Sequence, residues 1–410
     1  MGPSRVLKIE SEVKMSIRSS RALTLVAACS ALIFVAAGCG SSHQGGGAAS
    51  PSSGPTSASP TSASPVASTP GSVSPTPAQP SGGPVPAAFK AASVTFVSTQ
   101  EAFVLGTAPS SGTCILRTLD RGQTWVALSA PSAPLGRPGS SSAQTVWGTR
   151  FASAAHGFVF GVGLWETTDG GRHWTSDSAP SGSIISLATI DGQVLALTAK
   201  GSLLRRPLAG GSWSTVASVK PVDLMNPTDL ISTQAGTAAV LDGKSVLLTS
   251  DGGLTVTQRA TPSTPQGVTP SSVAVTSADG LALLCLGQGY TGHTDKRVYV
   301  SADGGATWNK AGIPSNEGDG GTLAGNPSDL VLVTASAASW IDRSSDGGQT
   351  WATLKTYGDG GAGWADLGFT TSADAVVVHG PADTAGGSDG RPGKLLLSSD
   401  GGATWQTVSF

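Results

Sequence analysis

The sequence SSDGGATW at Ser398–Trp405 has four close counterparts elsewhere in this chain of 410 residues. They are TLDRGQTW (Thr118–Trp125), TTDGGRHW (Thr167–Trp174), SADGGATW (Ser301–Trp308) and SSDGGQTW (Ser344–Trp351). Two less complete copies lie between them: RPLAGGSW (Arg206–Trp213) lacks the Asp, and TSDGGLTV (Thr249–Val256) lacks the Trp. The last residues of successive copies are 39 to 54 positions apart. A repeat of this length is typical of β-propellers, in which each repeat forms one blade.

The residues around each copy predict four short strands per repeat. In the second repeat these strands are TVWGTRFA, HGFVFG, LWETTD and HWTSDS, separated by turn residues. Each eight-residue copy, called the box below, then lies at the hairpin between the third and fourth strands. The sequence therefore predicts an all-β protein whose residues 89–410 form a seven-bladed β-propeller of four-stranded antiparallel blades. The 56 glycines suit a fold with many tight turns.

The residue types of the box match the chemistry of a short hairpin turn. A Gly takes the position with positive φ, the Asp carboxylate accepts backbone N–H groups, and the Ser or Thr hydroxyl completes the network. The Trp opens the fourth strand and packs over the turn. Because the same Asp recurs in nearly every repeat, we interpret it as structural and not catalytic. The residues assigned to this role are Asp120, Asp169, Asp251, Asp303, Asp346, Asp400, Trp125, Trp174, Trp308, Trp351 and Trp405.

The pattern S/T-x-D-x-G-x-T-W resembles the Asp-box (BNR) repeat, and the resemblance covers residues 90–410. The residue pattern of each repeat is most similar to that of propellers of the photosystem II stability/assembly factor type, and it also resembles sortilin and xyloglucanase propellers. Sialidases share the box but have six blades and an Arg-Ile-Pro motif before the first box. This chain has no Arg between Cys39 and Arg117, so the resemblance does not extend to sialidase activity.

The N-terminal residues have the features of an export signal. Arg18 and Arg21 precede an apolar stretch from Ala22 to Ala37, which ends at Gly38-Cys39. This ending resembles a bacterial lipobox and implies lipidation of Cys39; the alternative is a plain signal peptide. We therefore assign residues 1–38 to a lipoprotein signal peptide, with Met15 as the better start. The expected location is the outer face of a bacterial cell membrane, held by the lipid anchor.

Residues 39–88 form a spacer rich in Ser, Pro, Gly and Ala, in which residues 40–88 carry no charged side chain. Such a composition predicts a disordered tether. The whole chain has a formal charge of −2, which argues against a nucleic-acid partner. Cys114 and Cys285 fall in repeats one and five, so we expect two buried free thiols and no disulfide. The five His residues show no metal-ligand spacing, so the sequence implies neither a metal nor a cofactor.

Four residues outside the boxes are candidates for ligand binding: Trp147, Arg150, Trp364 and Asp366. They lie on or near inferred first strands, which line the channel of a propeller, where Trp stacks on sugars and Arg binds carboxylates. The alternative for each Trp, and for Trp340, is packing between blades. Besides Arg150, the pair Arg205 and Arg206 is the only hint of a basic patch in the sequence. The incomplete box that contains Arg206 predicts that this pair lies on the rim.

Two classes of function remain open. The preferred one is a non-enzymatic module that binds a protein or a glycan, or assists assembly, at the cell surface. The alternative is a divergent glycosidase of the Asp-box class, which needs two carboxyl groups on either side of the scissile bond. Asp366 is the best-placed carboxylate for such an enzyme, and Asp342 and Asp359 are weaker candidates. The solvated or turn carboxylate is the competing interpretation of Asp366.

Overall fold

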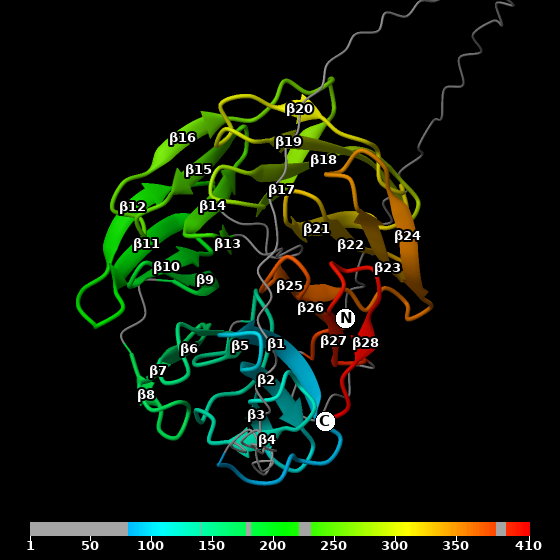
Figure 1. Cartoon of the computed structure of the whole chain (residues 1–410). Coiled ribbons are helices and arrows are strands. Elements are labelled where there is room, and N and C mark those ends of the chain that lie inside the picture. The colour runs from blue at the N-terminus through cyan, green and yellow to red at the C-terminus, as the bar shows by residue number, and fades with distance from the viewer. Residues whose placement is uncertain (1–80, 141, 178–181, 221–230, 383–390) are drawn as a thin grey trace, which may run out of the picture. The chain divides into compact units, whose positions relative to one another are not determined.

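The computed structural model describes residues 81–140, 142–177, 182–220, 231–382 and 391–410. They belong to one compact unit, Val73–Phe410. In this described part, 28 strands form seven separate four-stranded antiparallel sheets. Figure 1 shows the seven sheets arranged as blades around a centre. The predicted seven-bladed β-propeller is confirmed, and the signal peptide and nearly all of the tether lie outside the described residues.

Each blade takes its four strands in sequence order from one continuous segment. The strands of blades 1 to 4 are β1 (Lys90–Phe96), β2 (Ala102–Ala108), β3 (Gly112–Thr118), β4 (Val126–Leu128); β5 (Val146–Phe151), β6 (Gly157–Gly161), β7 (Leu164–Thr167), β8 (Thr175–Ser176); β9 (Ile184–Ile190), β10 (Gln193–Thr198), β11 (Ser202–Pro207), β12 (Ser214–Ser218); β13 (Ile231–Gln234), β14 (Thr237–Asp242), β15 (Ser245–Thr249) and β16 (Thr257–Ala260). The strands of blades 5 to 7 are β17 (Thr269–Val275), β18 (Leu281–Tyr290), β19 (His293–Ser301), β20 (Asn309–Lys310); β21 (Asp319–Gly325), β22 (Leu330–Ala335), β23 (Ser339–Ser344), β24 (Ala352–Tyr357); β25 (Trp364–Phe369), β26 (Ala375–His379), β27 (Lys394–Ser398) and β28 (Gln406–Thr407).

The first strands of the blades form the inner ring. Each of them contacts the first strand of the next blade, and β1 contacts β25, so the ring is closed. Because neighbouring strands are antiparallel, the turns between strands one and two and between strands three and four share one face. We call it the box face, and we call the opposite face, which holds the connections between blades, the linker face.

The hydrophobic core consists of seven clusters, and each cluster joins two consecutive blades. Phe158 and Phe160 of blade 2, for example, pack with Ile184 and Val194 of blade 3. Alternate side chains of a strand point to opposite sides of its sheet, so every blade contributes apolar residues to both neighbours. The ring is therefore held mainly by burial between blades.

Residues 81–88, which the sequence analysis placed in the tether, contact blade 1 in the structure. Gly83 pairs with Ala127 of β4 through two backbone hydrogen bonds of 2.9 Å. Val85 packs against the core between blades 7 and 1. The folded part of the chain thus begins before Phe89.

Candidate functional site

The six boxes that keep their Asp form the same local network. In blade 6, Ser344 Oγ donates to Asp346 Oδ1 at 2.7 Å and accepts the N–H of Gly348 at 2.8 Å. The Asp346 carboxylate also accepts the backbone N–H and the hydroxyl of Thr350. These hydrogen bonds lower the pKa of Asp346 to about 2, because they stabilise the ionised form. The hydrogen bonds that the sequence predicted for this turn are present, and they occupy the carboxylate.

The incomplete box of blade 3 has a different arrangement. Arg206, at the position of the Ser or Thr, is only 4% exposed and pairs with Glu166 at 2.8 Å and Asp177 at 2.6 Å, both in blade 2. Its guanidinium lies 5.4 Å from the Phe158 ring centre and 5.2 Å from that of Trp213. The expectation that Arg206 contributes to a basic patch on the rim is wrong. The side chain is buried between two blades, and two carboxylates neutralise its charge.

The structure brings Arg150 and Asp366 together inside the ring. Arg150 Nη2 lies 2.6 Å from Asp366 Oδ1, and the two side chains are 22% and 10% exposed. The other carboxylate oxygen of Asp366 accepts the N–H of Val94 at 2.7 Å. Two other pairs of inner strands are linked in the same way: Ser93 Oγ accepts the N–H of Thr149, and Ser272 Oγ accepts the N–H of Leu323. Asp366 thus occupies a position whose side chains connect one blade to the next.

The backbone of Asp366 is unusual for a strand residue. Its φ is +51°, and the pairing of β25 with β26 shifts register between Ala365 and Gly368. An Asp tolerates this conformation better than most residues, and the two hydrogen-bond partners hold it there. The pair therefore connects blade 7 to blades 1 and 2.

The three Trp residues that the sequence analysis considered for ligand binding or blade packing lie in packed surroundings. Trp147 and Trp340 are 8% and 9% exposed, and Trp147 belongs to the core between blades 2 and 3. Trp364 is half-buried and donates its Nε1–H to the carbonyl of Thr334 at 2.8 Å. Packing between blades accounts for Trp147, whereas Trp364 retains an exposed portion next to the channel.

Around Trp364 the structure assembles a cluster that the sequence did not predict. Asp359 accepts the Ser339 hydroxyl at 2.9 Å and lies 2.5 Å from His379 Nε2. The His379 ring packs against Trp364 and Tyr357, with ring centres 4.6 and 4.2 Å apart. Burial lowers the pKa of His379, although the adjacent Asp359 opposes this effect.

This cluster has the residue types of a hydrolase triad but not its geometry. In a triad the His lies between the hydroxyl and the carboxylate, so that it takes the hydroxyl proton. Here the carboxylate of Asp359 lies between Ser339 and His379, and Ser339 is fully buried. The arrangement connects blades 6 and 7 and does not activate a nucleophile.

A second buried polar group lies between blades 5 and 6. The ammonium of Lys296 donates to the carbonyls of Thr294, Glu317 and Gly318 at 2.9 to 3.2 Å. Burial lowers the pKa of Lys296 to about 8, and burial raises that of Asp342. Both side chains are 1% exposed, so Asp342 is not placed to reach a substrate.

The structure confirms two buried free thiols, Cys114 and Cys285. Burial raises the pKa of Cys285 to about 12, so this thiol behaves as a small apolar group. Within the described ranges, no three His, Cys, Asp or Glu side chains gather in a way that would hold a metal ion.

One element extends beyond the regular blades. Strands β18 and β19 have ten and nine residues, longer than any other described strand, and their turn projects on the linker face. Tyr290 at this turn is 58% exposed. Beneath the turn, His293 lies 3.3 Å from Glu317, and Thr294 donates to Asp319 at 3.0 Å. The hairpin therefore presents an exposed aromatic ring above two carboxylates.

No family model and no curated protein sequence matches the chain. Among solved structures it is similar to YCF48 bound to D1 peptide, with a TM-score of 0.51 and 17% identity over 77% of this chain and 95% of that chain. It is also similar to YCF48 from Cyanidioschyzon merolae, with a TM-score of 0.52 and 16% identity over 77% of this chain and 97% of that one.

These comparisons and the blade architecture place the chain among seven-bladed β-propellers. YCF48 is a photosystem II assembly factor, so the resemblance to propellers of that type, which the boxes predicted, is confirmed at the level of the fold.

Proposed function

We propose that this chain is a lipid-anchored propeller on the outer face of a bacterial membrane, where it binds a protein partner without catalysing a reaction. The observation that carries this proposal is the likeness to a propeller solved with a bound peptide. The use of Arg150, Asp366, Ser339 and His379 in contacts between blades agrees with it, because these groups are the strongest catalytic candidates.

The anchor depends on Cys39, which precedes the described residues. In the described ranges no helix is long and apolar enough to cross a membrane. We expect Cys39→Ala to move the protein from the membrane fraction to the soluble fraction, and Cys114→Ala to leave it in place. Full retention of Cys39→Ala in washed membranes would contradict the lipid anchor.

The surface that we assign to the partner is the projecting β18–β19 turn with the linker below it. Tyr residues are enriched in interfaces because they bury a large ring and still offer a hydroxyl. The side chains of Glu317 and His293 are 45% and 47% exposed, so the carboxylate below Tyr290 is accessible. A basic segment with an apolar side chain fits this combination.

The experiment places a photo-crosslinking residue at position 290 in membranes of the native host. Leu254 is the matched control, because it is 61% exposed and lies in the box of blade 4. We expect one protein to crosslink at 290 and not at 254, and Glu317→Lys to reduce its capture about tenfold, the equivalent of ~1.4 kcal/mol. Equal capture at both positions, or selective retention of a glycan by the purified protein, would contradict a protein partner at this surface.

The hydrolase alternative has its own test on the purified propeller. We expect no turnover of chromogenic glycosides by the natural chain. Turnover that Asp366→Asn abolishes, with the thermal midpoint preserved, would replace the binding proposal with an enzymatic one.

A further inference from the structure

The interface between blade 7 and blade 1, called the seam below, joins the two ends of the ring. Every blade consists of four strands from one continuous segment, so the first and last blades share no strand. The seam is therefore held by side-chain and backbone contacts between the two blades and not by a shared strand. The residues just before β1 supply additional contacts of this kind.

These residues, 82–89, form a short segment that we call the strap. It begins at the outer edge of blade 1, where Gly83 pairs with Ala127 of β4, and it ends at the start of the inner strand β1. Because Gly83 lies one strand spacing beyond β4, four spacings of about 4.8 Å, roughly 19 Å, separate it from β1. Seven residues from Gly83 to Lys90 span at most ~23 Å, so the strap can cross all four strands.

The strap packs between blade 7 and blade 1, in contact with specific side chains of both blades. Val85 and Phe89 pack in the core that contains Val378 and Leu395 of blade 7. The Phe89 ring meets that of Phe410 with centres 4.8 Å apart. A Cβ at Gly106 would lie 2.4 Å from the Phe89 ring, so only glycine leaves room for it.

The chain turns sharply between the strap and β1. Ala88 has a φ of +57°, a conformation that a non-glycine residue adopts at an energetic cost. Pro84 and Pro86 restrict the backbone on the outer side of this turn. The surrounding packing therefore has to hold the strap in place.

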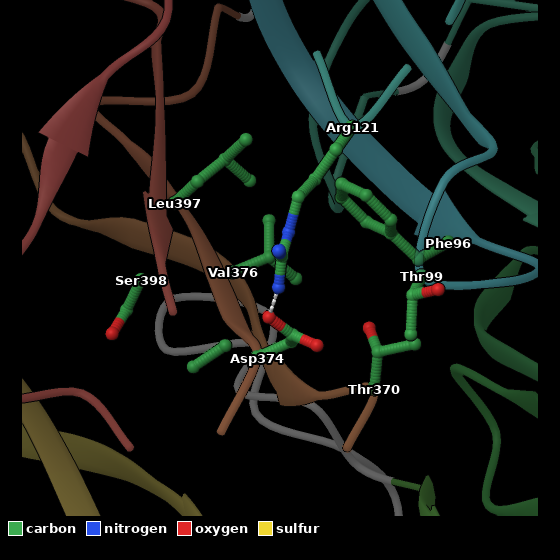
Figure 2. A pocket seen from close by; sticks show the side chains of 9 residues that line it. Phe96, Thr99, Arg121, Thr370, Asp374, Val376, Leu397 and Ser398 are labelled. Carbon is green, nitrogen blue, oxygen red and sulfur yellow. Dashed lines mark ion pairs between the residues drawn. The ribbon is translucent and has the colours of Figure 1, made fainter. Parts of the chain in front are cut away.

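Contacts at three other places in the interface also hold the seam. On the linker face, the N–H of Ala91 donates to Gly393 and its carbonyl accepts from Ala382, at 2.8 and 2.9 Å. In the channel, Asp366 accepts the N–H of Val94. On the box face, Arg121 stands where five of the other boxes have Gly, and it pairs with Asp374 of blade 7 across the groove lined by Phe96 and Leu397 in Figure 2.

We propose that residues 82–89 act as a closing strap that holds the propeller ring shut at the seam. The strap secures the outer end of the interface, which the backbone, channel and box-face contacts do not reach. Because the strap continues directly into the preceding chain, unseating it opens the seam before any other interface between blades. This inference is independent of the proposed partner.

The test is hydrogen exchange, read by mass spectrometry on the full chain. We expect Phe89→Ala to raise exchange about tenfold in β1, β27 and β28, and to leave β9 to β11 within about twofold. Phe160→Ala is the matched control, since it removes a buried Phe from the interface of blades 2 and 3. It should raise exchange in β6 and β9 and not in β27. Unchanged exchange in β27 and β28 for Phe89→Ala would overturn the strap.

A reversible variant covers the case in which Phe89→Ala fails to fold. Gly83 and Ala127 form a hydrogen-bonded antiparallel pair, whose Cα atoms are about 5.5 Å apart and so suit a disulfide. A Cβ at Gly83 meets only the Ala127 carbonyl, at 3.9 Å. In Gly83→Cys with Ala127→Cys, oxidation should slow exchange at the seam about tenfold and reduction should reverse it. No difference between the two redox forms would overturn the proposal.

Discussion

Blade 3 and blade 6 make the same hairpin with different chemistry. In blade 6, Ser344, Asp346 and Thr350 bond to one another within eight residues. In blade 3, Arg206 stands at the position of Ser344 and bonds to Glu166 and Asp177 of the preceding blade. The complete box stabilises its own turn, whereas the incomplete box stabilises the contact between two blades.

The difference shows that the box and the ring are stabilised separately. The network of Ser344, Asp346 and Thr350 is confined to one hairpin, so a network of this kind can be lost from one repeat without loss of the fold. The position that it frees points toward the neighbouring blade, because Arg206 packs on Phe158 of blade 2 as well as on its own Trp213. Blade 3 is thus not merely a degraded repeat.

The largest expected effect comes from Arg206→Met. Removing one partner of a buried ion pair leaves uncompensated charge, which costs about 3 to 5 kcal/mol. Glu166 and Asp177 are 19% and 16% exposed, so we expect the low end of this range, about 3 kcal/mol, in urea unfolding. The control combines Arg206→Met with Glu166→Gln and Asp177→Asn and should recover more than half of the loss. If the triple variant is no more stable than Arg206→Met, the charges are not the cause.

A smaller effect is expected when a complete box is broken. Asp346→Ala removes a carboxylate that accepts hydrogen bonds from Ser344 and Thr350. Because the turn is exposed to water, we expect a measurable loss of stability in urea unfolding that is smaller than the loss for Arg206→Met. The loss should add to that of Arg206→Met, since the two sites share no partner. Strong coupling between the two substitutions would contradict separate stabilisation.

The contrast between the two boxes also explains what the sequence could predict. The box chemistry is local and recurs in six blades, and the copy in blade 3 keeps enough of the sequence pattern to be recognised, so the fold, the blade number and the hairpin position followed from it. The position of Arg206 did not follow, because its partners lie 40 and 29 residues away in another blade. The same holds for Asp366 and Val94, whose contact depends on closure of the ring.

For the same reason, some of the other residues near the channel were predicted from the sequence and others were not. Arg150 and Asp366 were both selected as residues near the channel, and the structure pairs them. The cluster of Ser339, Asp359 and His379 was missed, since no sequence spacing reveals which residues of different strands and linkers converge. Most of the segment before β1 was assigned to the tether, because its Gly and Pro content matches that of the preceding spacer.

Acid should separate the two kinds of box. The folded-state pKa of Asp251, Asp303 and Asp346 is about 2, below the ordinary value of 3.8. Their contribution to stability is complete above pH 3.8 and is lost as the pH falls toward 2. The free energy of unfolding of the natural chain should therefore decrease between pH 4 and pH 2.5. Asp346→Asn should show a shallower decrease, and a decrease equal to that of the natural chain would contradict this role of the box carboxylate.

The smallest effect is expected from completing the box of blade 4. Val256 occupies the position at which Trp174 and Trp308 donate their ring N–H to the preceding blade, at Ser129 and Ala260, over 2.9 and 3.0 Å. We expect Val256→Trp to stabilise the chain by about 0.5 to 1 kcal/mol, the net contribution of one hydrogen bond. Trp308→Val should cost a similar amount, measured under the same urea conditions. If Trp308→Val is destabilising and Val256→Trp is neutral, the box Trp stabilises the contact between blades only where the preceding blade offers a carbonyl, as blades 1 and 4 do.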